Sequence, residues 1–500
     1  MQFGARLWGK CPAFLLRALW LWCLAVLVWP WLGGGGWAVS ADLKARVDAL
    51  VRPVIESGTA VGMVVGVVDG PHTAIFGYGQ LSPECPQTPD GRTLFEIGSV
   101  TKVFTGILLA DAVQRSEVAL DEPLAKLLPP HVKVPEWESR TVTLLDLVTH
   151  TSGLPRLPPN LLPQIAKYPR NPYAHYTVAQ MYEALAEIRL QSRPGSKYLY
   201  SNFGMGLLGH ILARRAGKDY ESLVVERVCR PLGLADTRIT LSEAQRQRLS
   251  PGHDIDGQAL PCWDFLSLPG AGALRSTAED LVRFVLANLE QTQTPLGPVL
   301  SEAQVPRRDI GSGQKIALGW HINTGRGTHW HNGQTGGYHS YVAFCKQKKI
   351  GVVVLSNTAG GIGDVLGVRL LEMLAGGTVE PPAVRMPIRL PREKLDRYVG
   401  TYEIVPGFAI TVFRQGDRLW AQATNQPRLG IYPASETRFF YRAVEAELEF
   451  VIEPDGRIEK LIVHQHGLHL PGWRGGLAGQ AVRSAIEVFR RGTAAAPSQP

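Results

Sequence analysis

The sequence is poor in cysteine and contains no motif that joins cysteines into a metal or redox site. Six cysteines occur in 500 residues, none forms a Cys-x-x-Cys pair, and no histidine spacing completes a zinc site. Gly-x-Ser-x-Gly is also absent, so the sequence does not support the esterase chemistry of α/β-hydrolases. The net charge of +8 comes from scattered basic residues, so nothing indicates a nucleic-acid-binding surface.

Acidic residues are missing from the start of the chain, where none occurs before Asp42. Basic residues there precede an almost wholly apolar run over 18–32, and small residues occupy 38–40. This layout predicts a signal peptide over 1–40 and export to the periplasm or the extracytoplasmic face of the cell envelope. The length of the apolar run leaves open an uncleaved leader that associates with the membrane. The basic residues are Arg6, Lys10 and Arg17.

Four cysteines follow this leader and lie far apart in the sequence. Export would permit disulfide bonds among them, but their spacing indicates no pairing, and buried free thiols are equally compatible with it. These cysteines are Cys85, Cys229, Cys262 and Cys345.

Strand patterns occur at both ends of a long region of helical periodicity. This arrangement predicts an α+β fold, in which one antiparallel sheet is closed by both termini of the unit and carries flanking helices and an inserted helical subdomain. We assign this catalytic unit to residues 41–377. The predicted strands cover 62–68, 72–78, 340–345 and 351–355. The predicted helices cover 42–56, 99–114, 144–148, 181–188, 205–216, 278–289 and about 365–374.

Prolines change the composition after this unit. They predict a stiff, extended linker over 378–392. Short strand patterns with turns between them then predict a small all-β domain over 393–476, followed by a tail over 477–500. The predicted strands of this domain cover 398–403, 409–414, 418–423, 439–442, 447–452 and 458–464.

Ser99 and Lys102 stand three residues apart at the start of an apolar helix pattern. Positions i and i+3 share a helix face, so the Lys102 amine can approach the Ser99 hydroxyl and accept its proton. A lysine acts as a base only when its pKa falls, which burial and a nearby cation produce. The alternative is that Ser99 merely caps the helix. The same motif recurs at Ser312 and Lys315, where no helix pattern follows, and we interpret it as a coincidence.

Two later segments add polar groups suited to the same chemistry. Tyr200 and Asn202 precede a second apolar helix pattern, and a phenol and an amide there can relay a proton and hold a substrate carbonyl. His331, Asn332 and Gly333 come just before the strand predicted at 340–345. A strand edge there can offer a backbone N–H to an oxyanion beside the N–H of Ser99.

Taken in order, Ser-x-x-Lys, Tyr-x-Asn and His-x-Gly resemble the motifs of the serine β-lactamase and penicillin-binding-protein superfamily. Residues 149–155 (THTSGLP) and 270–277 (GAGALRST) are similar to connecting segments of its class C branch. Within that branch, 96–111, 144–155 and 200–215 most resemble D-alanyl-D-alanine carboxypeptidases/endopeptidases of the AmpH type. The resemblance covers about residues 45–375 and implies the β-lactamase/transpeptidase-like fold.

The resemblance also implies roles for individual residues. Ser99 would be the acylated nucleophile and Lys102 its base or proton shuttle. Tyr200 would act as acid and base at the leaving group, and Asn202 would bind substrate.

The third motif departs from the family pattern, although its residues are still expected to bind substrate together with Gly333. His331 replaces the lysine common in class C β-lactamases. Asn332 stands where a Thr or Ser hydroxyl usually helps to hold the substrate carboxylate. This second change puts efficient β-lactam turnover in doubt more than acylation itself.

Three functions remain open at this stage. The first is an acyl-enzyme hydrolase that acts on D-Ala-D-Ala peptides of peptidoglycan or on β-lactams. The second is a promiscuous esterase on the same scaffold, and the third is a non-catalytic cell-wall binding or sensor protein. No metal or organic cofactor is expected, because His329 and His331 have no third ligand near them. His150 belongs to a connecting segment, and we interpret it as structural.

Overall fold

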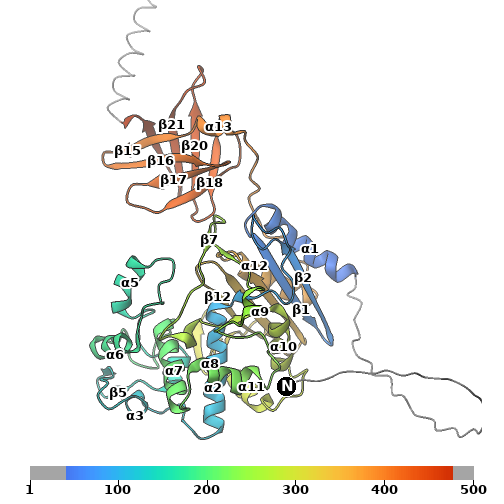
Figure 1. The fold of residues 1–500 in the computed structure, drawn as a ribbon, viewed down its shortest axis with the longest axis vertical. Helices are drawn as coiled ribbons and strands as arrows, with labels where there is room; N and C mark the ends of the chain where they lie inside the picture. The colour runs from blue at the N-terminus through green and yellow to red at the C-terminus, as the bar shows by residue number, and fades with distance from the viewer. Residues whose placement is uncertain (1–40, 477–500) are drawn as a thin grey trace, which may run out of the picture. The chain divides into compact units, whose positions relative to one another are not determined.

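The computed structural model describes residues 41–476 (Figure 1). The predicted signal peptide and the predicted tail over 477–500 lie outside these residues. Within the described range, no helix has the length and apolar character needed to cross a membrane.

The centre of the first part of the chain is an eight-stranded antiparallel sheet with the order β2-β1-β14-β13-β12-β11-β10-β9. The first strand, β1, pairs with the last, β14, along seven residues, so both ends of this part meet in one sheet, as predicted. The strands are β1 (Gly62–Asp69), β2 (His72–Gly79), β9 (Arg308–Gly311), β10 (Gln314–Ile316), β11 (His321–Asn323), β12 (Thr328–Gln334), β13 (His339–Cys345) and β14 (Ile350–Ser356).

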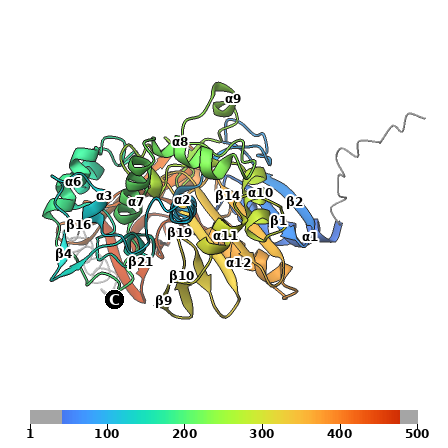
Figure 2. The same cartoon turned by 90° about the horizontal axis from the view of Figure 1, so that it is seen from below.

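Alternate residues of the central strands enter two separate hydrophobic cores, as the two-residue period of a strand requires. Val64 and Val68 of β1 belong to the larger core, which includes α10 (Ala278–Asn288) and the helical region. Val65 and Val67 of the same strand belong to a smaller core. Helices α1 (Ala41–Glu56) and α12 (Ile362–Leu374) form that second layer, and Figure 2 shows them across the sheet from α10 and α11 (Gly297–Ala303).

The helical region is built around α2 (Thr101–Gln114), which is buried along nearly its whole length. Its apolar character on all sides reflects a position inside the core rather than on a surface. This arrangement of sheet and helices confirms the predicted α+β class. The remaining helices are α3 (Leu124–Leu127), α4 (Leu144–Val148), α5 (Leu162–Lys167), α6 (Val178–Glu187), α7 (Asn202–Arg215), α8 (Tyr220–Val224), α9 (Glu243–Arg246), α11 (Gly297–Ala303) and α13 (Arg392–Asp396).

The C-terminal strands form a closed eight-stranded antiparallel barrel, which confirms the predicted all-β character. Two of the eight, β18 and β22, are absent from the predicted set. Pro433 in the first and Pro471 in the second weaken a strand pattern, because proline cannot donate to the ladder. The strands are β15 (Gly400–Val405), β16 (Phe408–Gln415), β17 (Arg418–Ala423), β18 (Arg428–Pro433), β19 (Arg438–Tyr441), β20 (Glu447–Ile452), β21 (Ile458–Gln465) and β22 (Leu468–Arg474).

The four cysteines after the leader are free thiols in the structure. Cys229 and Cys345 are buried, whereas Cys85 and Cys262 are partly exposed. Of the two possibilities that the sequence left open, the structure shows free thiols.

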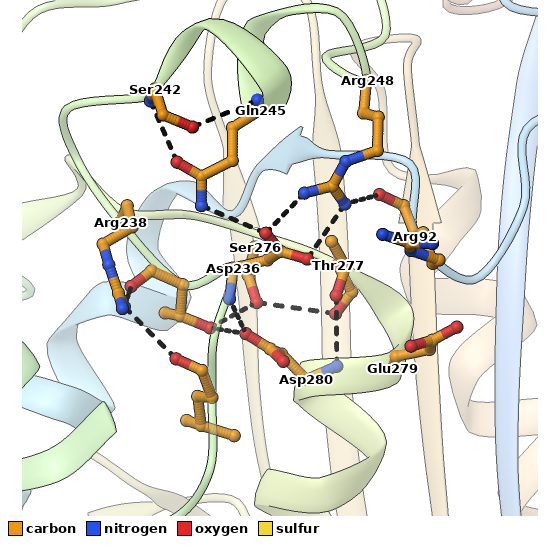
Figure 3. A network of polar contacts seen from close by, with 12 residues as sticks. Arg92, Asp236, Arg238, Ser242, Gln245, Arg248, Ser276, Thr277, Glu279 and Asp280 are labelled. Atoms are coloured by element: carbon orange, nitrogen blue, oxygen red, sulfur yellow. Dashed lines mark hydrogen bonds and ion pairs between the residues drawn. The ribbon is translucent and has the colours of Figure 1, made fainter. Parts of the chain in front are cut away.

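A network of polar contacts surrounds the short strand next to the Ser99 segment (Figure 3). Asp280 Oδ2 accepts hydrogen bonds from the Asp236 N–H at 2.8 Å and the Thr237 hydroxyl at 2.9 Å. Arg248 pairs with the Asp236 carboxylate. The network adjoins the short strand β8 (Arg275–Ser276), whose partner β3 (Phe95–Glu96) ends three residues before Ser99. It therefore supports the backbone on which the nucleophile candidate is placed.

Candidate active site

Ser99 lies in a single 3₁₀ turn, Gly98–Val100, immediately before α2. Its side chain makes no capping hydrogen bond, and Val100 occupies the N-cap position of α2. The alternative interpretation of Ser99 as only a helix cap is therefore wrong. The turn is pinned by Ser340 of β13, whose hydroxyl donates to the Ile97 carbonyl at 2.8 Å.

The Lys102 side chain is fully buried, and its Nζ atom lies 2.7 Å from Ser99 Oγ. It also donates to the Ala271 carbonyl at 2.6 Å. Burial holds the pKa of Lys102 well below its ordinary value, and the positive charge of Arg156 lowers it further. A buried amine with this neighbour is suited to accept the Ser99 proton. The Ala271 contact shows that the segment 270–277 contributes directly to the site.

Tyr200 stands over the same pair of residues. The Lys102 Nζ atom lies 4.9 Å from the centre of the Tyr200 ring. Burial raises the pKa of the Tyr200 phenol, while its hydrogen bond with Ser99 and the charge of Arg156 oppose that rise. The His150 ring lies against the Tyr200 ring, and the two ring centroids are 4.4 Å apart. These contacts hold the Tyr200 hydroxyl at the Ser99 side chain.

His150 is completely buried and adopts a left-handed backbone conformation with φ of 56°. Its Nδ1 atom accepts a hydrogen bond from the Ser201 N–H at 3.1 Å, so the ring proton is on Nε2. Burial keeps the pKa of His150 well below its ordinary value. The residue thus supports the chain at Tyr200, which agrees with a structural role.

Asn202 is the first residue of α7, and Ser201 caps that helix through its hydroxyl. The Asn202 amide donates to the Tyr173 hydroxyl at 3.2 Å. Its Oδ1 atom is buried and has no hydrogen-bond partner among residues 41–476. A buried acceptor without a partner costs free energy unless something else satisfies it. Asn202 can therefore receive an N–H group from a bound molecule.

The third predicted motif lies within β12, the strand that pairs with β13. His331 is fully buried, and its ring centroid lies 6.4 Å from that of Tyr200. Burial and the neighbouring His321 and Lys102 hold the pKa of His331 well below its ordinary value. The Asn332 amide donates to the Asp364 carboxylate of α12 at 2.9 Å. This side of the site thus presents an uncharged imidazole and an engaged amide.

Gly333 is the point at which β12 passes the turn that carries Ser99. A Cβ atom there would lie 2.0 Å from the Ile97 carbonyl oxygen and 2.8 Å from the Ser99 nitrogen. Gly98, whose φ is 46°, makes a similar close approach. A Cβ atom on Gly98 would lie 2.7 Å from the backbone nitrogen of Gln334. Only residues without a side chain permit this approach, which brings the backbone N–H groups of Ser99 and Gln334 close together.

A cleft of about 700 Å³ contains Ser99, Tyr200, Asn202, Asn332 and Gly333. The structure therefore brings five of the predicted site residues to one surface, with Lys102 and His331 buried next to it. Sequence reasoning missed several further residues of this cleft. They are Arg156, Tyr173, Trp263, His321 and Trp330.

The position of Arg156, directly after the segment 149–155, could have indicated it. His321 and Trp263 carry no comparable signal, because they come from distant segments. The His321 Nε2 atom lies 2.9 Å from the Tyr198 hydroxyl, and burial lowers the pKa of His321 to about 4. The backbone N–H of Trp263 donates to the buried carboxylate of Glu96, which also pairs with Arg275.

Within residues 41–476, no group of three or more His, Cys, Asp or Glu side chains is arranged to hold a metal ion.

Comparison with protein-family models assigns the first part of the chain. The model described as Beta-lactamase matches residues 47–376. The chain belongs to the beta-lactamase family. It is a serine hydrolase of that family. A second model, described as a domain of unknown function (DUF3471), matches residues 384–471 and so covers most of the barrel.

Individual relatives agree with this family. The D-alanyl-D-alanine-carboxypeptidase/endopeptidase AmpH of Escherichia coli (strain K12) is 30% identical over 345 residues, which is 64% of this chain and 88% of the relative. A beta-lactamase of the same strain is 31% identical over 358 residues, 64% of this chain and 90% of the relative.

Solved structures show the same fold. The beta-lactamase/D-alanine carboxypeptidase from Yersinia pestis, solved as a complex with citrate, superposes with a TM-score of 0.59 at 25% identity. That match covers 67% of this chain and 100% of the Yersinia chain. These matches confirm the expected resemblance to the serine β-lactamase superfamily and to D-alanyl-D-alanine carboxypeptidases/endopeptidases of the AmpH type.

Proposed function

We propose that the protein cleaves peptides ending in D-Ala-D-Ala through an acyl-enzyme on Ser99, as a carboxypeptidase or endopeptidase. The observation that carries this proposal is the 2.7 Å separation of Lys102 Nζ and Ser99 Oγ beside the Tyr200 ring. The activity for which the relative AmpH is named, D-alanyl-D-alanine carboxypeptidase/endopeptidase, supports the substrate class at 30% identity. β-Lactams would then react as mimics of the same peptide.

In the acylation step, neutral Lys102 accepts the Ser99 hydroxyl proton while Ser99 Oγ attacks the carbonyl carbon. The depressed pKa of Lys102 supplies the neutral amine that this step needs. The tetrahedral oxyanion is placed at the N–H groups of Ser99 and Gln334, which β12 brings together at Gly333.

The bond to the leaving group breaks in the second half of the same step. Tyr200 donates a proton to the departing amine and is reprotonated from Lys102, so no charge is left on the phenol. Water then attacks the ester on Ser99 and releases the enzyme. The Asn202 Oδ1 atom, which has no hydrogen-bond partner in the described part of the chain, accepts a hydrogen bond from an amide N–H of the acyl group.

A second candidate, a promiscuous esterase, is favoured by the β12 side of the cleft. Burial keeps His331 uncharged, and Asp364 engages the amide of Asn332. That strand therefore offers the terminal carboxylate of a peptide neither a cation nor a free amide at Asn332. A neutral ester needs neither of them.

A substrate panel separates these functions. The rates of hydrolysis of a D-Ala-D-Ala peptide, a cephalosporin and a short-chain ester are compared for the wild type and Ser99→Ala. The proposal expects the peptide to turn over and every activity to vanish in Ser99→Ala. Turnover of the ester alone would establish the esterase instead. Turnover that persists in Ser99→Ala would contradict both, and no turnover of any substrate would favour the binding or sensor protein.

We further propose that residues 41–377 form the catalytic unit, that 378–392 link it to the β-rich domain over 393–476, and that the protein is exported. The family match over 47–376 and the second match over 384–471 support this division. Detection of the protein in the periplasmic fraction, with Ala41 as its first residue, tests the export and the cleavage together.

A further inference from the structure

The cleft around Ser99 has a very uneven distribution of charge. Among the described residues that line it, Arg156 is the single lysine, arginine, aspartate or glutamate. Much of the remaining wall is apolar or aromatic, including Leu157, Ile165 and Trp263. The one formal charge on this wall is positive, so it attracts an anionic group that enters the cleft.

The strand on the opposite side of the cleft offers no competing cation. His331 in β12 is buried and uncharged, and the Asn332 amide already donates to Asp364. The carboxylate of Asp364 also lies 3.2 Å from His339 and adds negative charge behind the strand. An anionic group of the substrate is therefore attracted to the Arg156 side.

Arg156 is held in place through its backbone and leaves its side chain available. The Arg156 carbonyl accepts hydrogen bonds from the N–H groups of Asn202 at 2.9 Å and Phe203 at 3.2 Å. The guanidinium carbon lies 5.1 Å from the centre of the Tyr200 ring. The side chain is exposed and pairs with no carboxylate among residues 41–476. Five N–H donors in a planar fork are suited to a carboxylate.

The location of Arg156 next to Asn202 determines which part of a substrate it meets. In the proposed mechanism Asn202 faces the acyl group, whereas the terminal carboxylate of the peptide lies towards Asn332. We propose that Arg156 binds a carboxylate carried by the acyl part of the substrate, so that the enzyme prefers acyl groups with a free acid over their neutral counterparts. This inference rests on the proposed function and adds a substrate class to it.

Arg156 also influences the reacting groups, since its charge lowers the pKa of Lys102 and opposes the rise at Tyr200. Its loss could therefore slow all substrates alike without any role in recognition. The experiment must separate selection of an anion from this general effect.

Two substrates that differ only in one charge make that separation. They are the 4-nitrophenyl ester of N-succinyl-D-alanine, with a free carboxylate, and the same ester with that carboxylate methylated. For Arg156→Gln we expect the ratio of kcat/KM for the free acid to kcat/KM for the methylated ester to fall about ten- to a hundredfold, as expected for a lost charge-assisted hydrogen bond, because the general effect on Lys102 and Tyr200 is common to both esters and cancels in the ratio. Arg156→Lys should retain part of the preference, and Arg193→Gln, an exposed arginine outside the cleft, should retain all of it. Equal losses on both esters, or no loss on either, would overturn the proposal.

Binding to a protein that cannot turn substrate over keeps this test independent of the proposed function. Calorimetry compares N-succinyl-D-Ala-D-Ala with its succinyl methyl ester on Ser99→Ala and on the double variant with Arg156→Gln. We expect the free acid to bind Ser99→Ala more tightly, and this preference to disappear in the double variant. A preference that survives in the double variant, or is absent from both, contradicts the role of Arg156. If the preference behaves as expected while the wild type hydrolyses nothing, the proposed function fails and the anion site stands.

Discussion

The side-chain amide of Asn332 donates a hydrogen bond to the carboxylate of Asp364 across the sheet, at 2.9 Å. Asn332 lies in β12 at the cleft, whereas Asp364 lies in the first turn of α12, in the layer on the other side of the sheet. The Asn332 side chain is therefore not a free donor in the cleft. This pairing gives the departure in the third motif a structural meaning.

Replacing Asn332 by threonine should restore that donor. We expect Asn332→Thr to raise kcat/KM for a cephalosporin about tenfold, since a hydrogen bond to a charged group contributes roughly 1.5–3 kcal/mol. A neutral short-chain ester should change less than about twofold. Asn332→Ala, which also frees Asp364 but adds no hydroxyl, is the control. An equal gain in both variants would show that the hydroxyl is not the cause.

The close passage of β12 over the Ser99 turn makes Gly333 sensitive to substitution. In Gly333→Ala the new methyl group would meet the Ile97 carbonyl oxygen at 2.0 Å and must push strand and turn apart. We expect kcat to fall by about a hundredfold or more, because the oxyanion N–H groups separate. Steady-state kinetics and a circular dichroism spectrum measure activity and folding.

Gly325→Ala is the matched control for this substitution. Its new methyl group would find its nearest neighbour at 3.6 Å, so activity should stay at the wild-type level. A Gly333→Ala protein with full activity would contradict the close approach.

Buried histidines at the site make the protein acid-sensitive. The pKa of His321 is lowered to about 4 by burial, against about 6.5 in the unfolded chain. Between these values the unfolded state binds the extra proton, so the free energy of unfolding falls as the pH is lowered. By pH 4.5 this one residue should cost roughly 2–3 kcal/mol.

Urea unfolding at several pH values measures this dependence. In His321→Asn the free energy of unfolding should fall less steeply between pH 6.5 and 4.5 than in the wild type. His131→Asn, at an exposed position, should follow the wild type. Identical slopes for the wild type and His321→Asn would contradict the assignment.

Removal of Asp280 from the polar network next to β8 should lower the stability of the protein. Asp280 is buried, and Asp280→Ala would leave the Asp236 N–H and the Thr237 hydroxyl without their acceptor. We expect the free energy of unfolding to fall by about 2–4 kcal/mol. Glu279→Ala on the same turn, at a partly exposed position, should cost about 0.5 kcal/mol or less. Chemical denaturation compares the two, and equal losses would contradict the role of the network.

The sequence predicted the parts of the site that belong to short motifs. Ser99 and Lys102 lie one helical turn apart, and Tyr200 and Asn202 adjoin a single helix start, so local spacing was informative. The second Ser-x-x-Lys motif, at Ser312 and Lys315, was predicted to have no helix after it. Ser312 lies in the turn between β9 and β10, as that prediction requires.

Other features depend on contacts between distant segments and could not be found in this way. Asp364 reaches Asn332 only because α12 packs across the sheet. His321 and Trp263 come from strands and loops that carry no motif, and tertiary packing alone brings them to the cleft. Strands β18 and β22 were missed because their prolines are unfavourable in isolation, although barrel closure accepts them.

The proposed function requires that Lys102 activates Ser99 for acylation. Intact-protein mass spectrometry after mixing with benzylpenicillin measures this activation as the rate at which one penicillin mass is added. We expect a single adduct on Ser99 in the wild type, none in Ser99→Ala, and in Lys102→Ala a rate lower by about a hundred- to ten-thousandfold, the range of general-base catalysis. Adduct formation at the wild-type rate in Lys102→Ala, or on a residue other than Ser99, would contradict it.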